Sequence, residues 1–289
     1  MKFGLIPINI GMRSPKPIVS LAQLAEASGF DSVWTAEHVM VPVDYASKYP
    51  YNDRGKMDAE PETNMVDPLI ALSAVAAATE TIKLGTGVNI LPQVNPLLMA
   101  KQTASLDFIS NGRLLLGLGI GWLKEEFDAM GTPYERRGAR FDEYLAAMKK
   151  VWSGDTVEHE GEFLKWTGFK SHPLPPQRPH MPLIIGGNAG KVFERVATLG
   201  NGWFAPPMES PDLLPPRLAA LREACDRLGR AYSDIEITAF WEARWGPDAI
   251  RKYQDMGVNR LVSPITAFGE GRAMDTLRQF GDKIIAKFA

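Results

Sequence analysis

Short apolar segments rich in β-branched residues alternate with segments of helical periodicity along the whole chain. Eight segments read as strands: 3–8, 32–35, 82–90, 114–120, 183–185, 203–205, 235–240 and 260–263. Eight strands, each followed by a helix, within 289 residues predict an α/β protein with a single (β/α)8 TIM barrel over residues 1–289. A doubly wound sheet is the alternative, but such a sheet does not need so regular an alternation.

Two long segments interrupt this rhythm, so we expect insertions after strands two and four. Residues 39–66 follow the second strand and are rich in proline, tyrosine and aspartate, whereas residues 155–182 precede the fifth strand and contain the hairpin-like TVEHEGEFLKW. The loop after a barrel strand lies on the catalytic face. Residues 39–66 are therefore predicted to form a lid, although an exposed or dimer-packing insertion fits their composition too.

Composition and charge exclude several classes of protein. A net charge of −2 leaves no broad basic surface for nucleic acid, and no apolar run approaches the ~18 residues of a membrane span. The N-terminal segment lacks the pattern of a secretory signal, so we expect a cytoplasmic protein. Cys225 is the single cysteine, which excludes an internal disulfide and a cysteine-based zinc site.

Few residues at the predicted strand ends can carry acid–base chemistry. Only Glu37, His38 and Glu242 titrate there, and no lysine is placed to form a Schiff base. The four histidines make neither an HxH pair nor an HExxH motif, so no metal site is predicted. An enzyme with so few working side chains often delegates its chemistry to a bound cofactor.

The stretch RLLLGLGIGW (113–122) looks at first like a nucleotide-binding loop. It lacks the strand–GxGxxG–helix unit of such a loop and a suitably placed acidic ribose ligand. We interpret Gly117, Gly119 and Gly121 as the part of strand four that leaves room for a ring overhead, with Trp122 at the rim.

The stretch PLIIGGNAGKVFERVATLGNGW (182–203) carries a phosphate signal. A strand ends in Gly186 and Gly187, Asn188 is suited to cap a helix, and the helix is predicted to begin near Ala189. Two glycines let backbone N–H groups approach an anion, and a helix N-terminus favours negative charge. The alternative is that these glycines serve only a tight turn.

Five motifs follow one another as they do in a known family. They resemble the bacterial luciferase-like oxidoreductases, and more narrowly the branch that uses the deazaflavin coenzyme F420; the motifs are DSVWTAEH, KLGTGVNILP, NPLLMAKQTASLDFISNGRLLLGLGIGW, GTPYERRGARFDEYLAAMKKVW and PLIIGGNAGKVFERVATLGNGW. The resemblance implies a (β/α)8 barrel, usually a homodimer, with the cofactor ring at the C-terminal mouth and its phosphate tail outside. It also implies a cis peptide bond between Gly87 and Val88, behind the ring.

The resemblance carries over to individual positions. His38 matches a histidine beside the reactive centre, where it orients substrate or stabilises charge, although a packing role is the alternative. Glu37 holds a ring edge or fixes the tautomer of His38, or is a buried structural acid. The cofactor-binding residues that the resemblance implies are Gly87, Val88, Asn89, Gly121, Trp122, Gly186, Gly187, Asn188, Gly202 and Trp203.

Some positions depart from the family pattern. Trp122 stands where the related sugar-phosphate dehydrogenases have an acidic residue, so that proton-transfer role is not transferred, and Trp122 is predicted to wall the substrate pocket. Asn89 replaces an aliphatic residue and is expected to reach the ring's polar edge. Arg136, Arg137 and Arg140 open a charged helix, where we favour helix anchoring over a phosphate site.

The leading functional hypothesis is an F420-dependent oxidoreductase that transfers hydride between the deazaflavin C5 and a small organic substrate. One alternative is a two-component monooxygenase that depends on reduced FMN and therefore on a flavin reductase partner. The other is a non-catalytic protein that binds a flavin or deazaflavin.

Overall fold

The computed structural model describes residues 1–268 and 273–288. Its parallel strands are β1 (Lys2–Ile6), β2 (Ser32–Thr35), β3 (Lys83–Thr86), β4 (Asn89–Ile90), β5 (Leu114–Gly119), β8 (Leu183–Gly186), β9 (Gly202–Phe204), β10 (Glu236–Phe240) and β11 (Arg260–Pro264). They form one sheet in the order β3-β2-β1-β11-β10-β9-β8-β5-β4, and pairing of β3 with β5 closes it into a barrel. The predicted (β/α)8 barrel is confirmed.

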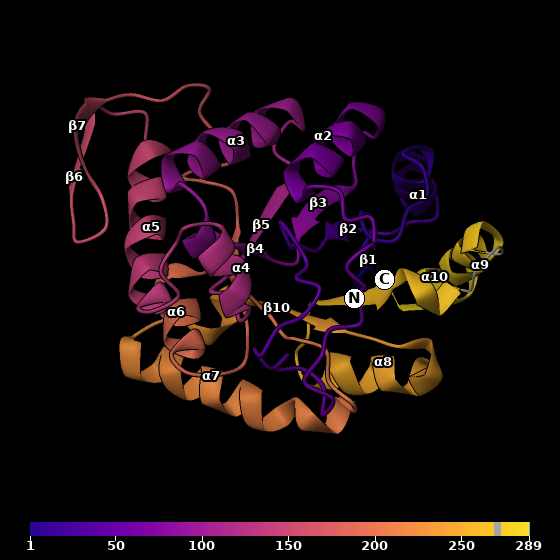
Figure 1. The fold of residues 1–289 in the computed structure, drawn as a ribbon. Coiled ribbons are helices and arrows are strands. Elements are labelled where there is room, and N and C mark those ends of the chain that lie inside the picture. Colours follow the sequence, from indigo (N-terminus) through magenta and orange to yellow (C-terminus); the bar gives the residue numbers. More distant parts are fainter. Residues whose placement is uncertain (269–272, 289) are drawn as a thin grey trace.

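Helices surround this barrel (Figure 1). They are α1 (Lys16–Ala27), α2 (Pro68–Ala78), α3 (Pro96–Ile109), α4 (Lys124–Ala129), α5 (Arg137–Val151), α6 (Val192–Leu199), α7 (Pro215–Leu228), α8 (Gly246–Asp255), α9 (Ala273–Phe280) and α10 (Ala286–Phe288). Short 3-10 turns cover Leu91–Gln93, Pro211–Leu213, Tyr232–Asp234, Ala243–Trp245 and Ile265–Phe268, and a π-helical turn covers Gly281–Ile285. Within the described residues, no helix combines the length and apolarity needed to cross a membrane.

Local sequence signals explain where α2 and α3 begin. Asp67 precedes α2 and its side chain accepts a hydrogen bond from the Ile70 N–H at 2.9 Å. Asn95 precedes α3 and accepts from the N–H groups of Leu97 and Leu98. Each cap is followed by a proline, whose fixed φ suits the first helical turn and whose missing N–H is not needed there.

One large side chain fills the centre of the barrel. The Trp34 indole is fully buried and donates from Nε1 to Ser32 Oγ at 2.9 Å. A Cβ added to Gly85 would lie 2.2 Å from this ring, and one added to Gly4 would lie 2.8 Å from Nε1. Glycine is therefore required on β1 and β3 because the neighbouring strand β2 sends a tryptophan inward.

The third strand is not continuous. The predicted segment 82–90 forms two strands, β3 and β4, separated at Gly87 and Val88, and the peptide bond between these two residues is cis. Thr86 Oγ1 accepts from the Gly117 N–H at 2.8 Å and donates to the Gly117 carbonyl at 2.7 Å. The Thr86 hydroxyl is thus hydrogen-bonded to both the N–H and the carbonyl of Gly117, so β3 and β5 stay joined beside the bulge.

The two insertions differ in structure. Residues 155–182 contain the predicted hairpin, formed by β6 (Val157–Glu160) and β7 (Lys165–Phe169), which stands beside α5 and away from the barrel (Figure 1). Residues 39–66 follow β2 without regular helices or strands.

A single buried side chain joins the two ends of the 39–66 loop. Asn9 Nδ2 donates to the carbonyls of Ala36 and Val66 at 2.8 and 2.7 Å, and Asn9 Oδ1 accepts from the Ala36 N–H at 3.0 Å. The Val66 N–H donates to the Asn9 carbonyl at 3.0 Å. The loop therefore leaves and re-enters the barrel at one point, next to the end of β1.

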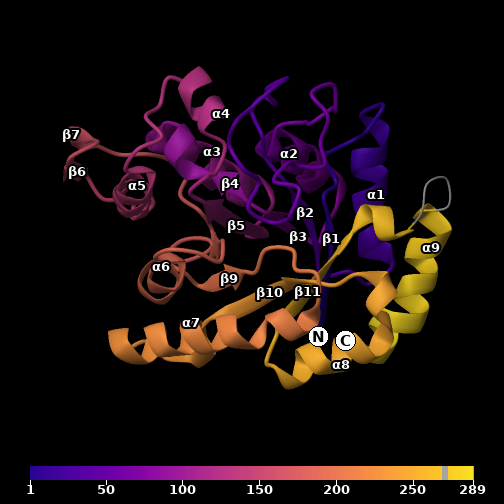
Figure 2. The ribbon, with the colours of Figure 1, turned by 60° about the horizontal axis from the view of Figure 1, so that its bottom comes forward.

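The chain ends also lie side by side (Figure 2). The amino group of Met1 donates to the carbonyl of Phe288 at 3.0 Å. Strands β1 and β11, the first and last of the chain, pair over five residues from Lys2 to Ile6 and close that side of the barrel.

Candidate active site

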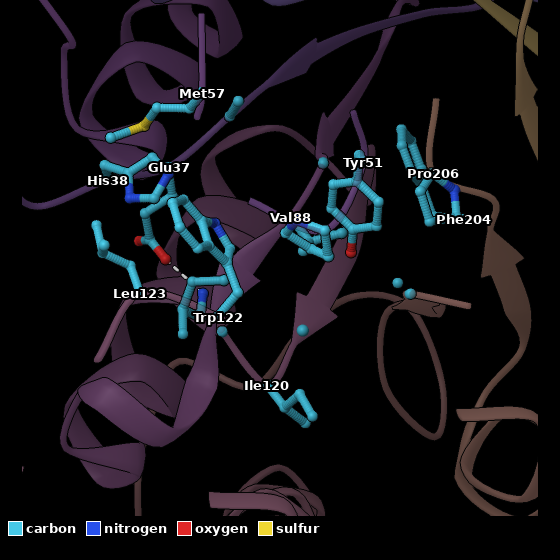
Figure 3. Close-up of a pocket in the computed structure, with 18 of the residues that line it drawn as sticks. Glu37, His38, Tyr51, Met57, Val88, Ile120, Trp122, Leu123, Phe204 and Pro206 are labelled. Atoms are coloured by element: carbon cyan, nitrogen blue, oxygen red, sulfur yellow. Dashed lines mark hydrogen bonds between the residues drawn. The ribbon is translucent and has the colours of Figure 1, made fainter. Parts of the chain in front are cut away.

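A cavity of about 610 Å³ opens at the C-terminal ends of the strands (Figure 3). Its walls come from the segments that follow β1, β2, β5, β8 and β9, from the bulge between β3 and β4, and from the 39–66 loop. Of the residues predicted from the sequence, the cavity is lined by Glu37, His38, Gly87, Val88, Gly121, Trp122, Gly186, Gly187 and Asn188. The ends of barrel strands are where active sites form in this fold.

The floor of the cavity is built around Val88. Cβ atoms added to Gly119 and Gly186 would lie 2.7 and 2.8 Å from the Val88 methyl groups, and one added to Gly117 would lie 1.7 Å from the Thr86 carbonyl oxygen. The glycines of RLLLGLGIGW therefore accommodate Val88 and the bulge directly. Gly117 and Gly119 thus leave room for Val88, and the expectation that a ring lies above this floor stays a prediction.

Glu37 is held by the backbone and side chain that follow the bulge. Its carboxylate accepts from Asn89 Nδ2 at 2.5 Å and from the Ile90 N–H. Burial raises the pKa of Glu37 to about 7, against the opposing effect of these two hydrogen bonds. Glu37 therefore changes protonation near neutral pH, which an ordinary exposed glutamate does not.

Asn89 does not reach the cavity. It is 1% exposed and lies behind Glu37, and its Oδ1 has no hydrogen-bond partner among the described residues. Side chains alternate along a strand, so Val88 facing the cavity turns Asn89 away from it. The expectation that Asn89 contacts the ring edge was wrong; it supports Glu37.

His38 is oriented by a carboxylate that the sequence analysis missed. Its Nδ1 lies 2.9 Å from Oε2 of Glu126, which is on α4 and is 1% exposed. Burial raises the pKa of Glu126, but the hydrogen bond and charge of His38 outweigh it and hold this pKa below its usual value. An ionised carboxylate only accepts hydrogen bonds, so the proton lies on Nδ1 and Nε2 is left to meet a ligand.

Glu126 also secures the start of the long loop. Its Oε1 accepts from the N–H of Val39 at 2.6 Å and from the N–H of Met40 at 3.3 Å. The interpretation that Glu37 fixes the tautomer of His38 was wrong, because Glu126 makes that contact. The sequence did contain a signal for this role, because the acidic pair Glu125 and Glu126 lies in the first turn of α4, the helix that follows β5.

A glycine turn and two arginines also line the cavity. Gly187 has a φ of +120°, a conformation that favours glycine, and it lines the cavity with Arg137 and Arg195. Arg195 donates to Asp142 at 2.6 and 3.2 Å, whereas Arg137 donates from Nε to the Gly121 carbonyl at 3.1 Å. A glycine turn beside two guanidinium groups is suited to an anion such as phosphate.

Several details around this turn differ from expectation. Helix α6 begins at Val192, three residues later than predicted, and Lys191 occupies the cap position without a side-chain bond, so Asn188 is not the cap. Arg137 lines the cavity as well as anchoring α5, whereas Arg140 anchors the helix as predicted, through the Pro133 carbonyl at 2.6 Å.

Gly202 and Trp203 lie outside the cavity lining. Trp203 is fully buried and donates from Nε1 to the Gly187 carbonyl at 2.7 Å, so it supports the glycine turn from behind. A Cβ on Gly202 would lie 2.7 Å from the Glu236 carbonyl oxygen, which explains the glycine by strand packing. Glu242, the third titratable strand-end residue, also lies outside this lining and pairs with Arg244 at 2.7 Å.

Aromatic side chains form one wall and the roof. The ring centroid of Tyr49 lies 5.2 Å from that of Trp122 and 5.3 Å from that of Tyr51, in edge-to-face contacts. The Trp122 and His38 rings are neighbours (Figure 3), with their centroids 5.9 Å apart. Trp122 therefore walls the pocket beside His38. No group of three or more histidine, cysteine, aspartate or glutamate side chains suited to a metal ion occurs in the described part of the chain.

Glu125 holds the middle of the 39–66 loop. Its Oε1 accepts from the N–H groups of Ala46 and Ser47 at 2.7 and 3.1 Å, and Ser47 Oγ accepts from the Lys124 N–H at 3.1 Å. Hydrogen bonds to the Ser47 side chain and to these backbone groups outweigh burial and lower the pKa of Glu125 to about 2. The neighbouring carboxylates of α4 thus hold this loop over the cavity.

Comparisons with known proteins agree with this architecture. A family model described as luciferase-like monooxygenase matches residues 6–257. An uncharacterised protein of Mycobacterium tuberculosis is 29% identical over 291 residues, covering 100% of this chain and 99% of that protein. The FMNH2-dependent dimethylsulfone monooxygenase of Pseudomonas putida is 28% identical over 247 residues, which cover 83% of this chain and 62% of that enzyme.

A solved structure shares the fold over the full length. The coenzyme F420-dependent tetrahydromethanopterin reductase of Methanopyrus kandleri matches with a TM-score of 0.79 and 18% identity, covering 100% of this chain and 99% of that one. Proteins similar to this chain thus include one named for FMNH2 and one named for F420.

Proposed function

Because the chain belongs to the luciferase-like monooxygenase family, whose relatives include F420-dependent and FMN-dependent oxidoreductases, we propose that it is an F420-dependent oxidoreductase acting on a small organic substrate. Bound F420 would supply hydride transfer at C5 of its deazaflavin ring.

The cavity fits a cofactor with a flat ring and an anionic tail. Its volume of about 610 Å³ lies within the roughly 300–1,000 Å³ of ordinary ligand sites. Val88 offers an apolar surface for a ring, with Glu37 at one side. The Gly186–Gly187 turn and Arg137 offer N–H donors to phosphate. The same set of groups would also accept FMN.

The His38–Glu126 pair carries the proposal. Hydride transfer to a carbonyl carbon, or from an alcohol carbon, requires a companion proton transfer at oxygen. With Nδ1 directed to Glu126, His38 holds Nε2 as the group that accepts a proton from a hydroxyl or returns one to an oxygen. The apolar wall of Trp122 beside it limits the access of water to this proton.

Binding and turnover separate the candidate functions. The purified protein is titrated with F420 and with FMN while cofactor fluorescence is followed, and oxygen consumption is recorded with each reduced cofactor. We expect tight F420 binding and substrate-dependent F420 oxidation or reduction without oxygen uptake. Oxygen-coupled turnover with FMN alone would refute the proposal in favour of the two-component monooxygenase, which requires a flavin reductase.

A variant tests the role of His38. We expect His38→Ala to lower turnover by about 10²–10⁴-fold, the usual contribution of a positioned acid–base group, while F420 affinity changes little. Unchanged turnover would remove this role. Tight F420 binding with no turnover over a broad panel of alcohols and carbonyl compounds would favour the non-catalytic binding protein.

An exposed apolar face supports a homodimer. Helices α2 and α3 are neighbours (Figure 1), and their exposed apolar side chains include Ile70, Leu98, Phe108 and Ile109, which are 58–68% exposed. Exposed apolar side chains grouped in this way often mark an interface between proteins. Light scattering of Phe108→Lys against the unchanged protein tests this assignment, because a buried lysine would weaken the dimer.

A further inference from the structure

We propose that the part of the cavity beside His38 selects an uncharged, ring-containing apolar molecule bearing one oxygen function, and that Tyr49 is a specificity-determining residue. This inference rests on the proposed function, because it concerns the substrate of the same site. It is argued from the shape, charge and polar groups of the cavity wall formed by the 39–66 loop and Trp122.

The wall facing His38 is aromatic. Tyr49, Tyr51 and Trp122 all line the cavity, and Met57 adds a flexible apolar side chain to the same lining. The Tyr49 ring is inclined by 88° to the Tyr51 ring and by 74° to the Trp122 ring, so the wall presents both ring faces and ring edges. Such surfaces favour a cyclic apolar guest, which gains edge-to-face contacts in addition to the burial of apolar area.

The charged groups near this wall already have partners. Glu126 is bonded to His38 and to the loop backbone, Glu125 is bonded to the loop, and Asp58 pairs with Arg54. Glu37 is the remaining carboxyl group of the lining near His38, and burial raises its pKa to about 7, so it offers at most a partial negative charge near neutral pH. An anionic substrate would therefore enter this space without a counter-ion, and burial of an unpaired charge is strongly unfavourable.

The two arginines of the cavity lining are already engaged. Arg195 pairs with Asp142, and Arg137 is bonded to the Gly121 carbonyl and stacks 3.8 Å above the Tyr134 ring. They line the cavity with the Gly186–Gly187 turn, which the proposed function gives to the cofactor tail. A carboxylate on the substrate would compete with the tail for these two guanidinium groups.

Aromatic walls also attract cations, which is the main competing class of guest. Tyr45 contacts Trp122 from outside the cavity lining and already holds the Lys56 ammonium 3.7 Å from its ring centroid, so a second cation beside this wall would be repelled. His38 Nε2 offers a single polar contact, which accepts a hydrogen bond from a hydroxyl or, when protonated, donates one to a carbonyl oxygen, but it satisfies only one of the three N–H donors of an ammonium group. The neutral guest is therefore preferred over the cationic one.

Binding measured without turnover tests the proposal. Cyclohexanol and cyclohexanone are titrated calorimetrically into the cofactor-free protein and into protein saturated with F420 or with FMN in the redox state that cannot react, reduced and without oxygen for the alcohol and oxidised for the ketone. The matched ions cyclohexanecarboxylate and cyclohexylammonium are titrated in the same way. We expect each neutral ring compound to bind at least about tenfold more tightly than either ion. An ion that binds as tightly as the neutral compounds would overturn the substrate class.

Variants of the loop test the role of Tyr49. Tyr49→Ala is expected to weaken binding of the ring compounds at least about fivefold, with acetone affected less, and Tyr49→Phe should retain most of the affinity. Tyr45→Ala is the matched control, because Tyr45 lies on the same loop and contacts Trp122 at 5.7 Å but does not line the cavity. An equal loss in the Tyr45 and Tyr49 variants would overturn the assignment of Tyr49.

The two proposals fail separately. If FMN binds and F420 does not, the proposed function fails while the preference for neutral rings is still read from the FMN-saturated protein. If F420 binds and turns over but charged substrates are preferred, the substrate class fails and the proposed function stands.

Discussion

Adding one methyl group to the cavity floor tests how the bulge at Val88 is accommodated. In Gly119→Ala the new Cβ would lie 2.7 Å from Val88 Cγ2 but 3.9 Å from Val88 Cβ. The first distance is a steric clash and the second is an ordinary contact. Overpacking of this kind typically costs about 1–3 kcal/mol, so we expect the free energy of unfolding to fall by that amount.

A second substitution should relieve the clash. Val88→Ala removes the two methyl groups and keeps the Cβ, at a cost of about 1 kcal/mol because the side chain is only partly buried. In the double variant the new methyl group at position 119 then has only ordinary contacts, 3.9 Å to the Cβ at 88 and 3.7 Å to Ile90 Cδ1. The double variant should therefore lose at least about 1 kcal/mol less than the sum of the two single losses.

Urea unfolding without cofactor measures the free energy of unfolding of the unchanged protein, of the two single variants and of the double variant. The dependence of this free energy on urea concentration should be the same for all four proteins. Gly117→Ala is the control, because its Cβ would lie 1.7 Å from the Thr86 carbonyl oxygen, a backbone atom that Val88→Ala leaves in place. Additive losses for Gly119→Ala and Val88→Ala, or equal rescue of Gly117→Ala by Val88→Ala, would refute this account of the floor.

Three further predictions concern the walls of the cavity. The pKa of Glu37 is about 7 in the folded protein and 4.5 in the reference state, so the stability that its protonated form contributes is lost as the pH rises through 7. The free energy of unfolding, measured in urea at pH 5 and pH 8, should therefore rise for Glu37→Gln relative to the unchanged protein between these two pH values. The same difference between the two proteins at both pH values would contradict this. Arg137→Leu should raise the Kd of F420 about tenfold or more but leave the Kd of its tail-free chromophore unchanged, as measured by fluorescence titration. Glu125→Ala should speed proteolytic cleavage within residues 39–66 while the urea midpoint stays the same, because only loop contacts are removed; equal cleavage rates would show that this carboxylate does not hold the loop.

The barrel was predictable because its signal is local and repeated. Strand-like and helical periodicities alternate eight times, and caps such as Asp67 and Asn95 mark helix starts in the sequence itself. The break at Gly87 was not visible as a strand boundary, because it depends on space that glycines of β5 and β8 leave for Val88. That space is created by residues 30 or more positions away.

The candidate site was predictable in position but less so in detail. Motifs identify runs of neighbouring residues, whereas the alternation of a strand sends successive side chains to opposite sides, which is why Asn89 and Trp203 lie outside the cavity. The partner of His38 was missed because Glu126 is 88 positions further along the chain. Only the closure of the barrel brings the ends of β2 and β5 close enough for that contact.

The junction at Asn9 has a consequence for how such proteins diversify. Both ends of the 39–66 loop are tied to one asparagine, and β2, before the loop, pairs with β3, after it, through residues outside the loop. A loop of different length or sequence can therefore be transplanted between the same two points with little disturbance of the scaffold. New substrate preferences would then arise by exchange of a whole cassette, while the cofactor end of the site is inherited unchanged.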